Sequence, residues 1–217
     1  MRKMVHTVIF DIGGTLVDAP DIFKVIAKRV NDHNSGRWES LFKEEFDKLY
    51  HGDNFFDVKT ILIKVAKKLS VDYKTTDLSL EVEKIYRDNY LNHSSLYGNA
   101  LWTLKKLKEK NINIIAVTDA DSDILMPQLR KLGILDFFQD VLISSNLKMY
   151  KTSPNIIKHI LPKIKEPYEE ILFVGDSDID VKTAKNLGVK SVLIKRDGTV
   201  GKANLIIKDL RELVYLV

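Results

Sequence analysis

Short apolar runs alternate with amphipathic segments along most of the chain, and no other feature limits the fold as strongly. The apolar runs predict strands at Thr7–Phe10, Asn113–Thr118, Val141–Ser144, Ile171–Val174 and Ser191–Ile194, with Leu205–Ile207 as a short sixth. Segments between them have apolar residues at helical spacing and predict helices at Ala100–Lys110, Ser122–Leu132, Pro154–Leu161 and Ile179–Leu187. Strands that alternate with helices indicate an α/β fold, in which crossover helices join the strands of a parallel sheet.

The alternation is interrupted between Asp18 and about Leu96, where no strand is predicted. Four stretches there have apolar residues at helical spacing, namely "DIFKVIAKRVNDH", "WESLFKEEFDKLY", "FFDVKTILIKVAKKL" and "LSLEVEKIYRDNYL". Four helices in a row, placed after the first strand of a parallel sheet, indicate an inserted all-helical subdomain.

Length and composition exclude several classes of protein. The 217 residues suffice for one sizeable domain with a smaller insertion. The absence of cysteine excludes disulfides, thiolate metal sites and a cysteine nucleophile. The net charge of +4 comes mostly from dispersed lysines, which indicate solvated helix faces and no nucleic-acid partner. No apolar stretch has the length of a membrane span or of a signal peptide, so we expect a cytoplasmic protein.

Polar side chains follow the predicted strands at their carboxyl ends, where open α/β sheets bind ligands. Asp11 follows the first strand, and a carboxylate there can act as a nucleophile or a metal ligand. Thr118 ends the second strand, and its hydroxyl can donate a hydrogen bond to a phosphate oxygen. Lys151 lies beyond the third strand, just before a helix start, where a lysine can neutralise an anion.

Three aspartates follow the fourth of these strands within five residues, namely Asp176, Asp178 and Asp180. Like charges this close repel unless a divalent cation offsets them, and an oxygen-rich site suits Mg²⁺. Taken singly, each polar residue is as well explained as a turn residue, a surface lysine or a helix cap. Their common place at one edge of the sheet favours phosphate and metal chemistry.

The chain resembles the haloacid dehalogenase-like (HAD) hydrolase superfamily. The motifs that carry the resemblance are "VIFDIGGTLVD", "IIAVTD", "YKTSP" and "VGDSDID", in this order, and the resemblance covers almost the whole chain. It implies a Rossmann-like core formed by residues 1–18 and 97–217, with a helical cap formed by residues 19–96. It also implies that the chain acts on a small phosphorylated metabolite and uses Mg²⁺.

The family mechanism assigns roles to individual residues of this chain. Asp11 is the expected nucleophile, which would form a covalent aspartyl intermediate that water then hydrolyses. Thr118, Asp119 and Lys151 are expected to bind the substrate, and Lys151 is also expected to restrain the Asp11 carboxylate. The expected ligands of Mg²⁺ are Asp11, the backbone carbonyl of Gly13, Asp176 and, directly or through water, Asp180.

Position 13 departs from the pattern of the family's phosphatases, which carry an aspartate two residues after the nucleophile. That aspartate protonates the leaving group and then activates water, whereas Gly13 offers only its backbone carbonyl. Haloacid dehalogenases and phosphonate hydrolases also have a non-acidic residue there. Metal-independent dehalogenases typically lack the carboxylates that this chain has as Asp176 and Asp180. The phosphonatase interpretation needs a reactive cap lysine, and none of the many cap lysines stands out.

Other side chains could supply the missing proton. Asp119 and Asp121 flank the second motif, and Asp18 lies where the cap begins, although the family often has an aspartate there without this role. Cap histidines are more often ordinary surface residues, and an arginine–tryptophan pair is more often cap packing than a substrate contact. The cap residues concerned are His33, His51 and His93, and Arg37 with Trp38.

Together these patterns predict a Mg²⁺-dependent HAD-like phosphatase of a small phosphorylated metabolite, slowed by the glycine at position 13. Two alternatives stay open. The chain could be a 2-haloacid dehalogenase-like or phosphonatase-like hydrolase, or a non-catalytic protein that binds a phosphorylated metabolite. The sequence names neither the substrate nor the oligomeric state.

Overall fold

A computed structural model describes residues 4–30, 34–50, 55–72, 77–196 and 202–217. Six strands form one parallel sheet in the order β5-β4-β1-β6-β7-β8, which confirms the predicted α/β fold. Each predicted strand is present, with its ends moved by one residue at most. The strands are β1 (Thr7–Phe10), β4 (Asn113–Thr118), β5 (Asp140–Ile143), β6 (Ile171–Gly175), β7 (Lys190–Ile194) and β8 (Leu205–Ile207).

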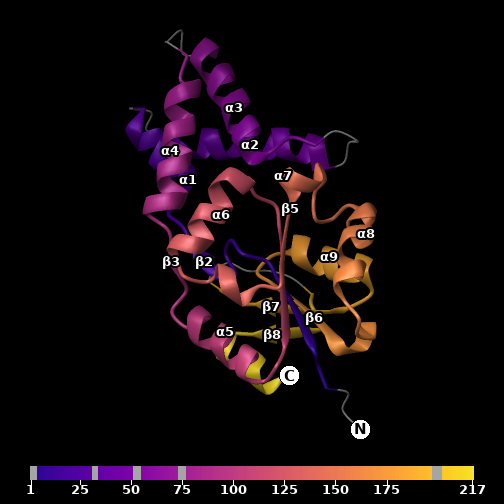
Figure 1. The fold of residues 1–217 in the computed structure, drawn as a ribbon. Coiled ribbons are helices and arrows are strands. Elements are labelled where there is room, and N and C mark those ends of the chain that lie inside the picture. The colour runs from indigo at the N-terminus through magenta and orange to yellow at the C-terminus, as the bar shows by residue number, and fades with distance from the viewer. Residues whose placement is uncertain (1–3, 31–33, 51–54, 73–76, 197–201) are drawn as a thin grey trace.

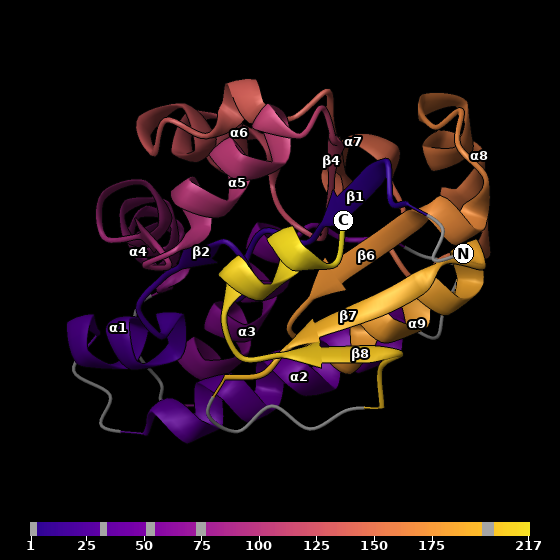
Figure 2. The same ribbon diagram turned by 90° about the horizontal axis from the view of Figure 1, so that it is seen from below.

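Helices cover both faces of the sheet, because successive strand residues point to opposite sides. Phe10 of β1 packs in the core that contains α5 and α6, whereas Ile9 packs in the core that contains α8 and α9. Figure 2 shows these two layers on either side of the strands. The helices are α5 (Ala100–Glu109), α6 (Ser122–Lys131), α7 (Ser144–Leu147), α8 (Ile157–Ile160) and α9 (Asp178–Leu187).

One predicted helix is wrong in type and length. Within Pro154–Leu161 only the four residues of α8 are α-helical, and 3₁₀ turns flank them at Pro154–Ile156 and Leu161–Lys163. Proline has no backbone N–H, so Pro162 cannot continue an α-helical hydrogen-bond ladder. The sequence pattern indicated helical spacing but did not distinguish one α-helix from three short turns.

Four helices form a separate hydrophobic cluster at one end of the sheet. Figure 1 shows them on the side of α6 and α7, opposite to both chain termini. Trp38 is completely buried in this cluster together with Ile26, Leu69 and Val82. It therefore packs the interior and does not face a substrate. The four helices are α1 (Ile22–Arg29), α2 (Ser35–Tyr50), α3 (Val58–Asp72) and α4 (Ser79–Asn92).

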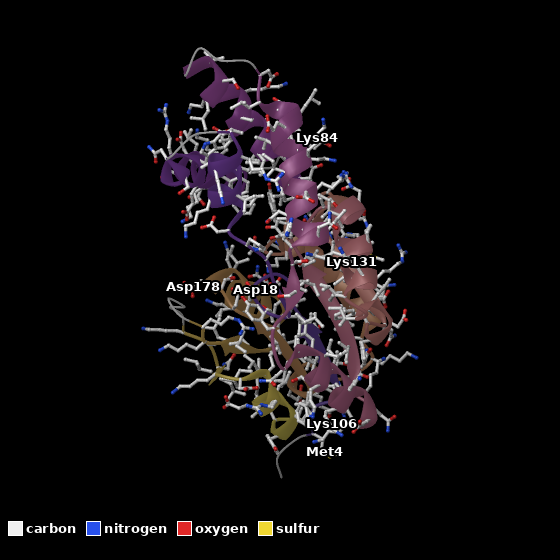
Figure 3. The ribbon with its side chains drawn as sticks, turned by 90° about the vertical axis from the view of Figure 1, so that its left-hand side faces the viewer. Met4, Asp18, Lys84, Lys106, Lys131 and Asp178 are labelled. Carbon is white, nitrogen blue, oxygen red and sulfur yellow. The ribbon has the colours of Figure 1, made fainter. Side chains whose placement is uncertain are left out.

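A two-stranded antiparallel ribbon, which the sequence did not predict, joins the two ends of this helical segment. Val17–Asp18 (β2) pairs with Ser95–Leu96 (β3). Two residues are too few to show the alternation of a strand, which explains the omission. Figure 3 shows Asp18 where the helices meet the core, far from Met4. Within the described ranges, no helix is both long and apolar enough to cross a membrane.

Candidate active site

A buried ammonium group connects two carboxylates at the carboxyl edge of the sheet. The Nζ of Lys151 lies 2.7 Å from Asp11 Oδ1 and 2.6 Å from Asp180 Oδ1. Asp11 directly follows β1, Lys151 follows α7, and Asp180 lies in the first turn of α9. All three residues are buried, so the two ion pairs are shielded from water. Three separate segments therefore meet at one charged centre.

The charges at this centre shift one another's protonation. Burial raises the pKa of Asp11 to about 7; Lys151 opposes the shift, while the carboxylates of Asp180 and Asp176 add to it. Burial would lower the pKa of Lys151, but its acidic neighbours Asp11, Asp180 and Asp119 hold it well above its ordinary value. Burial also raises the pKa of Asp176, and Asp180 adds to that increase. The site thus holds more negative charge than its one lysine balances.

Asp176 completes a carboxylate cluster that suits a hard divalent cation. Oxygen atoms of Asp11, Asp176 and Asp180 all lie within 4.8 Å of one another. The donors are carboxylate oxygens, as Mg²⁺ prefers, and burial together with neighbouring carboxylates raises the pKa values of Asp11 and Asp176. The third crowded aspartate, Asp178, is exposed and is not part of this cluster (Figure 3).

Asp180 is fixed by the start of its own helix. Its Oδ2 accepts hydrogen bonds from the backbone N–H of Asp176 and Ser177, at 3.1 and 3.0 Å, and from Ser177 Oγ at 2.7 Å. This capping box leaves Oδ1 to pair with Lys151. An added Cβ at Gly175 would overlap the Asp180 carboxyl group, so a glycine is needed at the end of β6.

The turn after β1 contains two glycines in different circumstances. Gly14 has φ +74°, and a Cβ added there would overlap the Asp176 carboxylate. Gly13 does not have a positive φ, and a Cβ added there would meet no atom within 4 Å. Thr15 follows and donates its hydroxyl to Asp176 Oδ1 at 3.2 Å. Gly14 is therefore required by geometry, whereas Gly13 leaves room for a side chain.

Arg196, just beyond β7, holds this turn from outside. Its Nε donates to the Gly14 carbonyl and its Nη2 to the Thr15 carbonyl, both at 2.7 Å. Its guanidinium also stacks 3.3 Å from the centre of the Tyr97 ring. A planar fork can bind two carbonyls in this way, which a lysine cannot reproduce.

The remaining predicted substrate residues lie beside the charged centre. Thr118 is buried at the end of β4, next to β1 in the sheet. Asp119 Oδ1 accepts a hydrogen bond from the backbone N–H of Lys151 at 2.9 Å. Asp119 therefore positions the lysine segment, and its role toward a substrate stays a prediction.

The suggested proton donors have other partners. Asp121 accepts hydrogen bonds from the backbone N–H of Val58 and Lys59, at 3.1 and 2.9 Å, so it caps α3. Asp18 accepts a hydrogen bond from the Tyr97 hydroxyl at 3.2 Å. His93 is exposed and lies 3.4 Å from Asp88. His33 and His51 lie outside the described residues.

Sequence reasoning missed three residues that shape the site, namely Thr15, Ser177 and Arg196. A hydroxyl four residues after the nucleophile was a usable signal for Thr15, and a serine three residues before Asp180 was one for Ser177. Arg196 had no such signal, because its contact with the turn spans 182 residues.

The chain is similar to known proteins over most of its length. The chain belongs to the haloacid dehalogenase-like hydrolase family, whose model matches residues 8–194. A phosphoglycolate phosphatase of Aquifex aeolicus is 27% identical over 191 residues, with 87% of this chain and 84% of that protein covered. The pyrophosphatase PpaX of Halalkalibacterium halodurans is 24% identical over 196 residues, with 88% and 83% covered.

Solved structures show the same fold at lower identity. The HAD-hydrolase YfnB of Bacillus subtilis, solved bound to magnesium, superposes with a TM-score of 0.81 at 18% identity, with 99% of both chains covered. An L-2-haloacid dehalogenase of Xanthobacter autotrophicus gives a TM-score of 0.76 at 17% identity, with 98% of both chains covered. At such identities the agreement concerns the fold.

The neighbouring glycines should respond differently to the same substitution. Gly14→Ala places a Cβ against Asp176 and forces a left-handed conformation, so we expect a loss of about 1–3 kcal/mol in the free energy of unfolding. Gly13→Ala is the matched control and should change it by less than about 0.5 kcal/mol. Urea unfolding measures both, and equal losses would contradict this account of the turn.

Proposed function

We propose that the protein is a Mg²⁺-dependent phosphatase that acts on a small phosphorylated metabolite through Asp11. One observation carries the proposal: the Asp11 carboxylate, at the end of a central strand, is held by Lys151 and lies within reach of two further carboxylates. Family membership and the phosphatase names of relatives such as the Aquifex aeolicus protein support it.

In the proposed reaction an Asp11 carboxylate oxygen forms a bond to phosphorus while the bond from phosphorus to the ester oxygen breaks. The departing alkoxide takes a proton and leaves as an alcohol. Water then attacks the phosphorus of the aspartyl phosphate, which releases inorganic phosphate and restores the carboxylate. Overall, one ester and one water give one alcohol and one phosphate.

Lys151 and Thr118 hold the reacting groups in this proposal. The Lys151 ammonium fixes Asp11 Oδ1 and offers positive charge to the phosphoryl oxygens. The Thr118 hydroxyl, at the end of the adjacent strand, donates to another phosphoryl oxygen. Thr15 and Arg196 keep the turn that carries the nucleophile in place.

The carboxylate cluster fits a magnesium ion, which Asp11, Asp176, Asp180 and the Gly13 carbonyl would hold. The bound ion would reduce the repulsion between an anionic nucleophile and an anionic substrate. Thr15 donates to Asp176, and Ser177 donates to Asp180, so hydrogen bonds within the protein orient both carboxylates.

Residues 19–96 are proposed to act as a cap over this site. Asp121, on the loop after β4, caps α3, and the Tyr150 hydroxyl donates to the Phe56 carbonyl at 2.9 Å. These bonds tie the beginning of α3 to loops that also carry Thr118 and Lys151. The cap and the site are thus positioned by the same loops.

A dehalogenase-like reaction is the second candidate, because Gly13 carries no proton donor and a halide leaving group needs none. The balance of charge favours the phosphatase, since three clustered carboxylates with one lysine suit a divalent cation better than a metal-free site. Halide release from 2-haloacids without metal would reverse this preference.

The proposed nucleophile can be tested directly. The parent should release phosphate from acetyl phosphate and small phosphate esters in the presence of Mg²⁺, whereas Asp11→Asn should reduce turnover by more than about 10³-fold. Colorimetric phosphate detection measures both, with unfolding curves to show that the variant folds. Undiminished turnover in the variant would exclude Asp11 as the nucleophile.

The proposed magnesium site can be tested with two neighbouring aspartates, one inside the carboxylate cluster and one outside it. Saturating Mg²⁺ should stabilise the parent by about 2–3 kcal/mol at 100 times the dissociation constant. Asp176→Asn removes a cluster ligand and should lose most of this gain, whereas the exposed Asp178→Asn should keep it. Thermal unfolding with and without Mg²⁺ decides; equal gains in both variants would contradict the assignment.

Gly13→Asp should restore the absent acid. A Cβ added at position 13 would meet no atom within 4 Å, so we expect the variant to fold normally. General acid catalysis is typically worth about 10²- to 10⁴-fold, so turnover of alkyl phosphates should rise by at least tenfold. Acetyl phosphate is the control substrate and should gain least, because its leaving group departs without a proton. No gain with alkyl phosphates would show that another group supplies the proton or that the natural reaction needs none.

A further inference from the structure

We propose that the natural leaving group is small, uncharged and hydroxyl-bearing, and that the site disfavours substrates with a second anionic group. This inference rests on the proposed phosphatase function and deepens it. It starts from a cavity of about 130 Å³ between the turn after β1, the loop after β4, and helices α4 and α6. Figure 1 shows α4 and α6 side by side above that end of the sheet.

The cavity lies where the leaving group of a substrate at Asp11 would go. Gly13, two residues after the nucleophile, lines it, and so do Thr118 and Asp119 from the neighbouring strand end. Its opposite wall comes from the proposed cap, through Tyr86 and Tyr90 of α4. A phosphoryl group held by Thr118 would therefore extend its ester substituent between the turn and α4.

Among the residues that the structure describes, thirteen line the cavity and none of them carries a positive charge. Two cations of the cap, Arg87 and Lys59, pair with the exposed Asp123, at 2.6 and 3.4 Å. The charged groups that do line the cavity are the carboxylates of Asp119 and Asp121. A carboxylate or second phosphate placed here would be partly buried beside like charges with no partner, which is costly.

The two aspartates do not require a positively charged leaving group as a partner. Both Asp121 oxygens already accept backbone hydrogen bonds from the start of α3, and Asp119 accepts one from Lys151. Both aspartates therefore already have hydrogen-bond donors within the protein and need no cationic ligand as a partner. Of the three possible charges of a leaving group, only an uncharged one would place no unpaired ion in the cavity.

The polar groups that α4 contributes to the cavity wall are tyrosine hydroxyls, which can form hydrogen bonds with an alcohol. Tyr86 is buried in this wall, and the centre of its ring lies 5.0 Å from that of Tyr90. Apolar side chains such as Ile124 and Leu125 fill the rest of the wall. The cavity is small, at about 130 Å³, and suits a compact leaving group better than a long one.

The test compares phosphate esters of similar size and different charge. With Mg²⁺ at one pH, kcat/KM for glycerol 3-phosphate should exceed that for phosphoglycolate, pyrophosphate and phosphoethanolamine by at least about tenfold. Acetyl phosphate reports whether the enzyme turns over at all. If it is hydrolysed but a charged substrate is best, this inference is overturned and the proposed function stands. If no substrate releases phosphate, both are overturned.

A charge placed in the cavity provides an independent arm. Gln128 is buried in the lining of the cavity. Gln128→Lys should reduce the ratio of kcat/KM for glycerol 3-phosphate to kcat/KM for phosphoglycolate by roughly tenfold. Gln139→Lys is the matched control, because Gln139 is exposed and precedes β5 at the opposite end of the sheet; the preference should not change. If this ratio were the same in both variants, the cavity would not be the site of the leaving group. Should Gln128→Lys fail to fold, the substrate comparison on the parent decides alone.

Discussion

The site depends on one buried ammonium group. Lys151 pairs with Asp11 and Asp180 at hydrogen-bond distance, and none of the three charges would be tolerable alone in this interior. The pairing requires that β1, the segment after α7 and the first turn of α9 reach one point. The glycines at positions 14 and 175 and the capping box of α9 all serve this convergence, since a side chain at either glycine would displace a carboxylate. Much of the local structure at this edge of the sheet follows from that requirement.

The sheet was predictable because parallel strands are buried on both faces and appear as short apolar runs. The runs "TVIF" and "NIIAVT" identify β1 and β4 with their actual bounds. The failures have equally physical causes. The segment from Pro154 has helical spacing, but it forms three short turns, and Pro162 lies in the last of them, where it cannot donate a backbone hydrogen bond. The β2–β3 ribbon is held by pairing across the whole helical insertion, which no local pattern shows.

The candidate site was predictable only as a set of strand ends. Order along the chain placed Asp11, Thr118 and Asp176 at one edge, and only the resemblance to a known family, not the spacing, distinguished Asp180 from Asp178. Asp180 points inward because its side chain caps its own helix, whereas Asp178, two residues earlier, faces water. Asp121 looked equally available as an acid, and only the structure shows that it holds α3.

Arg196 connects the turn that carries Asp11 with a distant part of the sequence. Its guanidinium holds carbonyls that lie 182 and 181 residues earlier in the chain. Contacts of such separation form late, because a long loop must close first. The turn that carries Asp11 is thus synthesised long before the arginine that holds it. A partly synthesised chain that ends before Lys151 carries the nucleophile without its partner, so the reactive arrangement requires segments that are made long after the turn itself.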